Sequence, residues 1–407
     1  MTKRGRLALA LGVVLYLTAW GFGSRPLYPV AVGLLLLNPV AWACVRLADR
    51  PLRLHRWTRK DDHVEGEDVE IDLDLECEPR LPTATFTLAE TIERFGERST
   101  ALDRRPRGRR GSRYLLENVP RGRYRFPDAR VVLEDPFALN RRELALPPTA
   151  ALLVFPRLVE LHRLFSEGSA GPQGGRRLLL RRPVGYDVHG VREYEQGESL
   201  RRVHWPTTAR RGQLMVKELE DSPRDEIAVV LDAEAGITAG RPPESSFDVQ
   251  VRAAGSILKA QARRGRRAVL VLNDRSGESL RVTSLDGDWR RALELLAGAE
   301  PNGLRSPVAL LAAESGPVAR ARELALVTAS LTATLVDRLI QRALGHTAVA
   351  VVYVDAASFA GRRPARPADA ALLVRLQSTG VPVAVLRRGD DLETALAGAE
   401  AVREARA

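Results

Sequence analysis

The chain has 407 residues, a length that suggests two or three domains, each large enough to bury a core. Its formal net charge is +11, but arginine is spread along the whole chain, so the charge does not mark one nucleic-acid-binding domain. The only two cysteines, Cys44 and Cys77, exclude a disulfide framework and a four-cysteine metal site.

Two apolar runs lie near the amino terminus, at residues 7–22 and 27–47, and only a four-residue turn at 23–26 separates them. A helix of about 20 apolar residues crosses the roughly 30 Å of hydrocarbon in a bilayer. The pattern therefore predicts a transmembrane helical hairpin within residues 1–50, in contact with lipid through residues 7–47. The alternative is a signal peptide, cleaved after about residue 22.

Basic residues are concentrated at the two ends of this predicted hairpin and are scarce in its turn. Lys3, Arg4 and Arg6 precede it, six more follow it within residues 46–60, and Arg25 alone lies in the turn. Because positive residues favour the cytoplasmic side of a membrane, we expect a two-pass protein of the cell membrane. Both termini and all the downstream domains would then lie in the cytoplasm.

Residues 51–156 predict a small antiparallel β-sandwich. Residues 69–76 alternate apolar and polar side chains, and short apolar runs recur at 84–88, 113–116, 130–133 and 151–155. The arginine-rich segment 104–113 favours a solvated hairpin loop, with contact to anionic lipid headgroups as the alternative. No nucleic acid is expected there, because no aromatic residues alternate with the arginines to stack on bases.

The last part of the chain, residues 223–407, changes to alternating strands and helices. Strands are predicted at 227–231, 267–272, 323–327, 348–354 and 381–386, with helices at 247–264, 289–296, 334–344, 367–378 and at the carboxyl terminus. Nearly continuous apolar strands between helices indicate an α/β domain with a doubly wound, mostly parallel sheet.

Residues 157–222 join these two domains and carry the most unusual composition of the chain. Arg192, Glu193 and Tyr194 precede a turn at Gly197, and a second arm then runs from Leu200 to Trp205. We expect the arms to pass each other, with Arg201 or Arg202 bound to Glu193, then a second turn at 207–212 and a strand at 213–217. The segment is either a charged connector between domains or a surface for a ligand or partner.

The spacing in this segment resembles the signature of the domain of unknown function 58 family, a bacterial group discussed alongside MoxR-type AAA+ ATPases. The matching positions are Gly185, Arg192, Tyr194, Gly197, Arg201, Trp205, Ala209, Arg210, Leu214 and Val216. Residues 135–139 and 154–158 also resemble family segments, and the resemblance covers most of residues 60–390. Glu198 and His204 depart from it, since the family usually carries aspartate at both positions.

The resemblance implies that the α/β domain is von Willebrand factor A-like, a fold that normally binds a divalent ion through Asp-x-Ser-x-Ser. Here that motif reads Asp232, Ala233, Glu234, Ala235 and Gly236, so both serines are replaced. The later loops lack a clear threonine around Ser306 and an aspartate after Thr328. We therefore expect a degenerate metal site at Asp232 and Glu234, without a bound metal or other cofactor.

No catalytic motif accompanies the six histidines, and His204 beside Trp205 is expected to be a packed or hydrogen-bonded residue. The sequence thus favours a non-enzymatic, membrane-anchored interaction scaffold, and the resemblance implies a MoxR-type ATPase as partner. The surface would comprise Arg192, Glu193, Tyr194, Gly197, Arg201, Trp205, Ala209 and Arg210. The alternatives are an anionic-ligand sensor using the same region and an enzyme acting through His204. Nothing in the residues specifies an oligomeric state.

Overall fold

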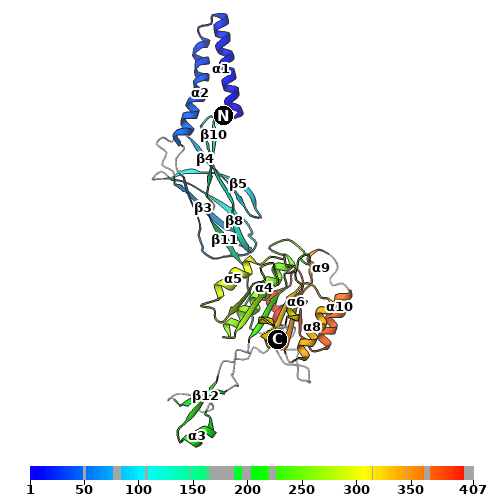
Figure 1. Ribbon diagram of the computed structural model, residues 1–407. Coiled ribbons are helices and arrows are strands. Elements are labelled where there is room, and N and C mark those ends of the chain that lie inside the picture. Colours follow the sequence, from blue (N-terminus) through cyan, green and yellow to red (C-terminus); the bar gives the residue numbers. More distant parts are fainter. Residues whose placement is uncertain are drawn as a thin grey trace, which may run out of the picture. The chain divides into compact units, whose positions relative to one another are not determined.

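The computed structural model describes residues 1–48, 52–76, 84–105, 109–147, 149–162, 164, 188–194, 203–219, 226–313, 315–345, 347–361 and 367–397. The chain forms two compact units, Met1–Val154 and Phe155–Ala407. The first unit contains a helical hairpin and antiparallel sheets, and the second contains a mostly parallel sheet (Figure 1).

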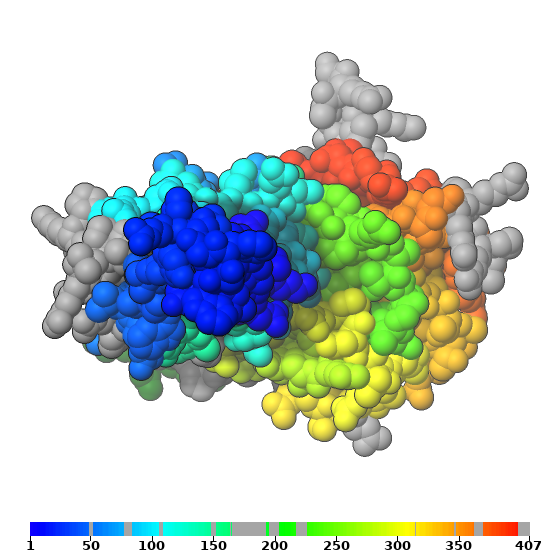
Figure 2. All heavy atoms as spheres, turned by 90° about the horizontal axis from the view of Figure 1, so that it is seen from above, coloured from blue at the N-terminus to red at the C-terminus, as the bar shows by residue number. Residues whose placement is uncertain are grey.

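The predicted hairpin consists of α1 (Lys3–Phe22) and α2 (Leu27–Ala48), which lie side by side and are seen end-on in Figure 2. Thr2 caps α1 by accepting a hydrogen bond from the Gly5 amide, so the helix begins earlier than the apolar run. Gly23 ends α1 with a φ of 65°, a conformation that glycine adopts without steric cost.

Both helices are long and apolar enough to cross a membrane, by length and composition alone. Their buried positions are mostly small residues at which the two helices meet, such as Gly5, Gly12 and Ala31. Large apolar side chains point outward instead, among them Leu7, Leu17, Trp20, Phe22, Val30 and Leu36. An apolar outer surface of this kind suits lipid better than water.

The antiparallel part of the first unit has two four-stranded sheets that share one apolar core. The first has the order β1 (Arg53–Thr58), β3 (Val69–Glu76), β7 (Arg109–Leu116) and β6 (Asp103–Arg105). The second has the order β10 (Arg141–Leu146), β9 (Asp128–Glu134), β4 (Thr85–Ile92) and β5 (Gly96–Ala101). A smaller sheet joins β2 (His63–Val64), β11 (Thr149–Phe155) and β8 (Gly122–Phe126). The core contains Ile71, Leu73, Phe86, Leu88, Val131 and Leu133.

The expectation of a solvated loop at 104–113 is wrong for the residues described there, because most of them form β6 and β7. On the outer face of the sheet, Arg109 pairs with Asp74 at 3.2 Å, and Arg113 pairs with Asp72 at 2.8 Å. The side chain of Arg110 turns inward and donates to the Ala84 carbonyl at 3.0 Å. The carboxylates that alternate along β3 explain why these arginines form a strand instead of a loop.

In the second unit, six strands form one sheet in the order β16 (Ser279–Val282), β15 (Ala268–Leu272), β14 (Ile227–Leu231), β17 (Glu323–Thr328), β18 (Ala348–Val354) and β19 (Val383–Leu386). All neighbours are parallel except β15 and β16. The first strand of this sheet in sequence, β14, lies at its centre. The next two strands, β15 and β16, lie on one side of it, and the last three lie on the other. This is a doubly wound sheet with its topological switch point between β14 and β17.

Helices cover both faces of this sheet (Figure 1). One face packs against α4 (Ser246–Arg263), α5 (Trp289–Gly298), α9 (Ala356–Phe359) and α11 (Leu392–Ala397). The other face packs against α6 (Pro307–Ala312), α7 (Pro317–Arg320), α8 (Ala333–Leu344) and α10 (Pro367–Ser378). Alternate residues of β14, such as Val229 and Val230, belong to the two opposite cores. This two-sided burial confirms the predicted α/β class, with its mostly parallel sheet.

Candidate functional site

The described residues of the signature segment form a small antiparallel pair, β12 (Val188–Glu193) and β13 (Met215–Leu219), with α3 (Trp205–Arg211) between them in sequence. Arg192 lies opposite Val216 in the register, and Val203 forms an isolated bridge to that same residue. Strand β13 therefore pairs with β12 on one side and with Val203 on the other.

The sequence predicted a turn at residues 207–212, but residues 207–211 belong to helix α3 and Gly212 ends that helix. Pro206 stands in the first helical turn, and Gly212 ends α3 with a φ of 70°. Thr208 accepts a hydrogen bond from the Met215 amide at 3.0 Å, which ties the helix to the start of β13. The indole of Trp205 is 64% exposed, and Ala209 and Arg210 on the same helix are also exposed.

His204 precedes the helix and is half-buried. Its Nδ1 lies 2.8 Å from the Thr207 hydroxyl oxygen, and its amide donates to the Met215 carbonyl at 2.7 Å. Its own carbonyl accepts from the amides of Thr207 and Thr208. These contacts join His204 to the backbone of α3 and to the start of β13.

The remaining signature residues are only partly described. Gly197 and Arg201 lie outside the described residues, and Arg192 is described by its backbone alone. Glu193 is exposed, Tyr194 is half-buried, and the Tyr194 amide donates to the Leu214 carbonyl at 2.9 Å. The predicted contact between Glu193 and Arg201 or Arg202 therefore stays a prediction.

A second polar cluster lies at the carboxyl ends of the parallel strands, at the switch point. Asp232 follows β14 and is only 2% exposed. One carboxylate oxygen accepts a hydrogen bond from the Thr328 hydroxyl at 2.6 Å. The other accepts from the Asn273 amide group at 3.0 Å and from the Glu234 amide at 3.1 Å. Three neighbouring loops are joined through this one carboxylate.

The loop at 301–306 closes over the same place. The Gly303 amide donates to the Ala233 carbonyl at 2.8 Å, and the Ala235 amide donates to the Gly303 carbonyl at 2.9 Å. A Cβ atom at position 303 would overlap the carbonyl oxygens of Asn273 and Ala233, so this close approach requires glycine. The next residue, Leu304, projects into solvent.

Burial raises the pKa of Asp232, and the hydrogen bonds from Thr328, Asn273 and Glu234 oppose that rise only in part. The pKa of Glu234 is also raised, first by burial and then by the negative charge of Asp232. The protein environment here disfavours a second negative charge.

The donor set at Asp232 does not fit a magnesium-type centre. Both carboxylate oxygens already accept protein hydrogen bonds, and Glu234 and Gly236 occupy the positions where serine hydroxyls would be needed. In the described ranges no group of three or more histidine, cysteine, aspartate or glutamate side chains is placed to hold a metal ion. We derive no metal-dependent chemistry at this position.

Sequence reasoning missed two members of this cluster, Asn273 and Thr328. Each stands immediately beyond or at the last residue of a parallel strand, which is the available signal. Their convergence on Asp232 depends on the strand order, because β15 and β17 must flank β14. That order is a property of the fold and cannot be read from the local sequence.

Comparisons with known proteins point to one family. A family model described as "Protein of unknown function DUF58" matches residues 190–360, a range that includes α3 and the switch-point cluster. The uncharacterized protein YeaD of Bacillus subtilis (strain 168) is 25% identical over 228 residues, which cover 54% of this chain and 53% of that protein. The chain thus spans about half the length of this curated relative. Neither description states an activity.

Two solved structures show weak similarity. One is the alkylpurine DNA glycosylase AlkC of Pseudomonas fluorescens bound to DNA containing an abasic site analog, with 14% identity over 30% of this chain and 38% of that chain, and a TM-score of 0.15. The other is a conjugative transposon lipoprotein from Bacteroides eggerthii, with 17% identity over 24% of this chain and 96% of that chain, also at 0.15. TM-scores this low indicate neither a shared fold nor a shared function.

Proposed function

We propose that this protein is a membrane-anchored, non-enzymatic scaffold that binds a protein partner through the α3 region of its signature segment. The observation that carries the proposal is the exposed indole of Trp205 on a backbone that β13 holds in place. Tryptophan is among the residues most often found at the energetic centre of protein interfaces. An exposed tryptophan with fixed surroundings loses little conformational entropy on binding.

Charge supports the same surface. Arg210 and Arg211 lie in the last turn of α3, are exposed, and stand beside the carboxyl end of the helix. Together with Trp205 they offer an aromatic anchor next to positive charge, which suits a partner surface with carboxylates around an apolar pocket. The partner we propose is a MoxR-type AAA+ ATPase, which the family resemblance implies and which would use this chain as adaptor or client during complex assembly.

We further infer that the α/β domain is a von Willebrand A-like scaffold that has lost its metal site. The hydrogen-bonded carboxylate of Asp232 supports this reading, since its oxygens are engaged by Thr328, Asn273 and Glu234. The helical hairpin would anchor the chain in the cell membrane. The basic residues on both sides of the hairpin support a cytoplasmic location for both soluble units.

The proposal can be tested by affinity capture from native membranes after mild crosslinking, followed by mass spectrometry. The test variant is Trp205→Ala, and the matched control is Leu344→Ala, which removes a 76% exposed apolar side chain at the end of α8. We expect an AAA+ ATPase to be enriched with the unchanged protein and with Leu344→Ala, and to be lost with Trp205→Ala.

Two results would contradict the proposal in different ways. Capture of an ATPase that is insensitive to Trp205→Ala would keep the partner and remove the α3 surface. A set of captured proteins without an ATPase would remove the proposed partner. In that case, saturable binding of an anionic ligand that is lost in Arg192→Ala would favour the sensor alternative.

A further inference from the structure

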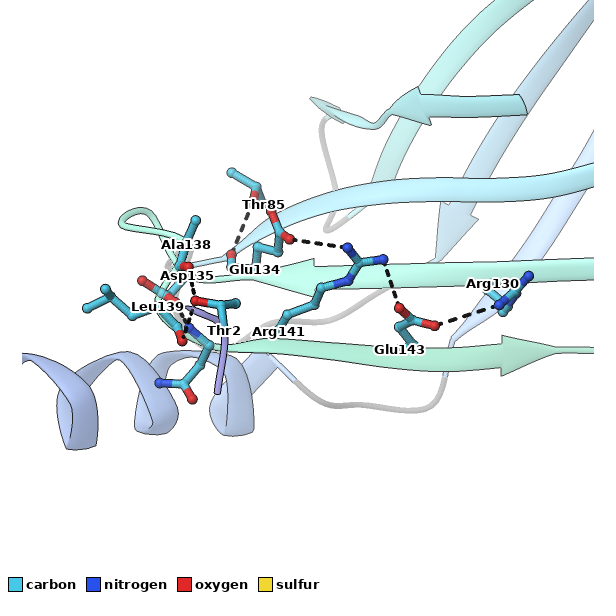
Figure 3. Close-up of polar contacts among 10 residues, drawn as sticks. Thr2, Thr85, Arg130, Glu134, Asp135, Ala138, Leu139, Arg141 and Glu143 are labelled. Carbon is cyan, nitrogen blue, oxygen red and sulfur yellow. Dashed lines mark hydrogen bonds and ion pairs between the residues drawn. The ribbon is translucent and has the colours of Figure 1, made fainter. Parts of the chain in front are cut away.

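The loop at residues 135–140, between β9 and β10, is fastened to the base of the helical hairpin (Figure 3). The Thr2 amide donates to the Leu139 carbonyl at 2.8 Å, and the Thr2 hydroxyl donates to the Ala138 carbonyl at 2.6 Å. The side chain of Asn140 donates to the Asn38 carbonyl at 3.2 Å. The loop therefore contacts the start of α1 and the middle of α2.

These contacts fix the level of the loop along the hairpin. Asn38 donates to the Gly5 carbonyl at 2.9 Å, so the beginning of α1 lies beside Asn38. Helix α2 continues from there to Ala48, about 15 Å further at about 1.5 Å per residue. Helix α1 packs beside the part of α2 before Asn38, and the loop packs beside α2 where this extension begins.

The extension of α2 has one face on the β-sheets and one face that remains apolar and exposed. Val45 and Ala48 belong to the core of the antiparallel sheets. On either side of this packed face, Val40 is 56% exposed and Trp42 is 59% exposed. The apolar outer surface of the hairpin thus continues past the start of α1 to the level of the loop.

The length of the hairpin also places the loop near the edge of the hydrocarbon. From Gly5 to Phe22 the helix rises about 26 Å, which is less than the roughly 30 Å of hydrocarbon in a typical bilayer. If the tip, with Trp20 and Phe22, reaches the far interface, then the near edge of the hydrocarbon lies at about the loop. Local thinning of the bilayer is the alternative way to absorb the difference.

Most backbone amides of the loop are satisfied by hydrogen bonds within the loop itself, as a segment close to hydrocarbon requires. Asp135, which is 2% exposed, accepts hydrogen bonds from the amides of Phe137 and Asn140 through its two carboxylate oxygens, at 2.9 and 2.6 Å. Its carbonyl accepts from the Ala138 amide, while Pro136 has no amide hydrogen. Backbone groups near hydrocarbon must be satisfied by the protein itself, because water is scarce there. The aromatic ring of Phe137 is 65% exposed all the same.

Basic side chains lie at the start of α1, next to the loop. Lys3, Arg4 and Arg6 are exposed in the first turns of α1, directly after the residue that binds the loop. Basic residues at the cytoplasmic surface are attracted to anionic lipid headgroups, each by about 1 kcal/mol. Phe137 with this basic rim has the chemistry of an interfacial anchor, in which an aromatic side chain enters the headgroup region beside cationic groups.

We propose that the loop at 135–140 is a second membrane contact, through which the β-domain rests on the bilayer with Phe137 inserted among the lipid headgroups. The inference rests on the proposed membrane anchoring and adds to it a contact made by a soluble domain. It sets the orientation of the β-domain relative to the membrane plane, because the loop and the hairpin are joined by hydrogen bonds from both Thr2 and Asn140.

The test places an environment-sensitive NBD fluorophore on Phe137→Cys in the full chain carrying Cys44→Ala and Cys77→Ala. The protein is reconstituted in phosphatidylcholine–phosphatidylglycerol vesicles with and without nitroxide-labelled lipid. Leu115→Cys is the control, because Leu115 is 44% exposed and stands near the far end of β7. Leu116 pairs with Val69, whereas Arg53, which follows α2, pairs with the opposite end of β3 at Glu76.

We expect the fluorophore at position 137 to emit at shorter wavelength and to lose most of its emission to the nitroxide lipid, while iodide in the aqueous phase quenches only position 115. Equal quenching of both positions by iodide would overturn the inference. A shifted emission at 137 without quenching by nitroxide lipid would also overturn it, since protein would then cover the site. Flotation with the vesicles is measured first, and failure to float would contradict the membrane anchor itself.

Discussion

At the scale of single residues, the Thr328 hydroxyl is shared between Asp232 and Ser330. The Thr328 hydroxyl lies within hydrogen-bond distance of both Asp232 and the Ser330 carbonyl, at 2.6 and 2.9 Å, yet it has only one hydrogen to donate. It also accepts from the Ser330 amide at 3.1 Å. The single Thr328 hydrogen can therefore bond to only one of these two acceptors at a time.

The first prediction follows from this network and from the raised pKa of Asp232. A raised folded-state pKa means that this residue contributes its full stability below its unfolded pKa of about 3.9, and that the contribution is lost as the pH rises through the folded value. We expect Asp232→Asn to remove this loss and to be at least as stable as the unchanged protein at neutral pH. Asp232→Ala should lose about 1–3 kcal/mol at every pH.

Thermal unfolding of the three proteins between acid and slightly alkaline pH checks this prediction. The curve of Asp232→Asn should be flatter than that of the unchanged protein over the range in which Asp232 ionises. If Asp232→Asn is destabilised at neutral pH as much as Asp232→Ala, then the charge of Asp232 is required. The cluster would then act through an ionised carboxylate.

A buried ion pair in the β-domain allows a second prediction at this scale. Arg56 and Glu90 are in direct contact with side chains only 6% and 2% exposed, and the Arg56 guanidinium lies 3.9 Å from the centre of the Phe126 ring. Arg56→Met leaves the Glu90 carboxylate buried without its main partner and should cost about 3–5 kcal/mol. Adding Glu90→Gln should recover part of the loss, because the uncompensated charge is then removed.

The control for this pair is Arg141→Met, which breaks the exposed contact between Arg141 and Glu143, 2.7 Å long, and should cost less than about 1 kcal/mol. Hydrogen exchange of β4 and β9 reports the stability of this core locally. Equal effects of the Arg56 and Arg141 substitutions on that exchange would show that burial adds nothing to the Arg56 pair.

At the scale of helices and strands, the elements that the sequence predicted best are those buried on both faces. Strands β14 and β18 are continuous apolar runs, and their predicted bounds match the structure. Strand β16 has the sequence Ser-Leu-Arg-Val at the sheet edge and is mostly exposed, so it lacks such a run. Helix α3 is too short to show helical periodicity, although Pro206 and Gly212 are its start and stop signals.

The hairpin was also predictable as an element, but its attachment was not. Residues 7–22 and 27–47 have the length and composition of membrane helices, and these properties are local. The bonds from the Thr2 hydroxyl to the Ala138 carbonyl at 2.6 Å and from the Thr2 amide to the Leu139 carbonyl at 2.8 Å join residues more than a hundred positions apart. Contacts of that range depend on the whole β-domain being folded.

A third prediction concerns this attachment. Thr2→Val removes the hydroxyl that caps α1 at Gly5 and binds the Ala138 carbonyl, and should cost about 1 kcal/mol or more. Thr18→Val is the matched control, since the Thr18 hydroxyl bonds only to the Leu15 carbonyl within its own helix, at 2.9 Å. Hydrogen exchange of residues 135–140 should accelerate in Thr2→Val and remain unchanged in Thr18→Val. An equal response in both would mean that Thr2 does not hold the loop.

At the scale of the whole molecule, the chain combines an apolar hairpin with a folded β-domain and an α/β domain. In the α/β domain, hydrogen bonds join the loops at the carboxyl ends of the parallel strands. The sequence predicted these parts because each has its own periodicity. It could not predict that Asn273 and Thr328 meet at Asp232, because that depends on strand order. Among the described signature residues, β13 pairs with β12 and with Val203, and the predicted contact between the two arms stays a prediction.

The last prediction is the membrane topology. The basic residues on both flanks of the hairpin favour a cytoplasmic location for both of its ends, which puts the turn at Ser24 on the opposite side. In intact cells of a Cys44→Ala, Cys77→Ala protein, a membrane-impermeant maleimide should label Ser24→Cys. It should label Ser276→Cys, in an exposed loop after β15, only after lysis.

An amino-terminal tag distinguishes the hairpin from a cleaved signal peptide in the same experiment. Cleavage after about residue 22 would remove Thr2, and with it the cap of α1 and its bonds to Ala138 and Leu139. The loop at 135–140 would then lose one of its two attachments while keeping an exposed phenylalanine. A retained tag together with external labelling at Ser24 fits the two-pass anchor, whereas loss of the tag and external labelling at Ser276 would place both domains outside the cytoplasm.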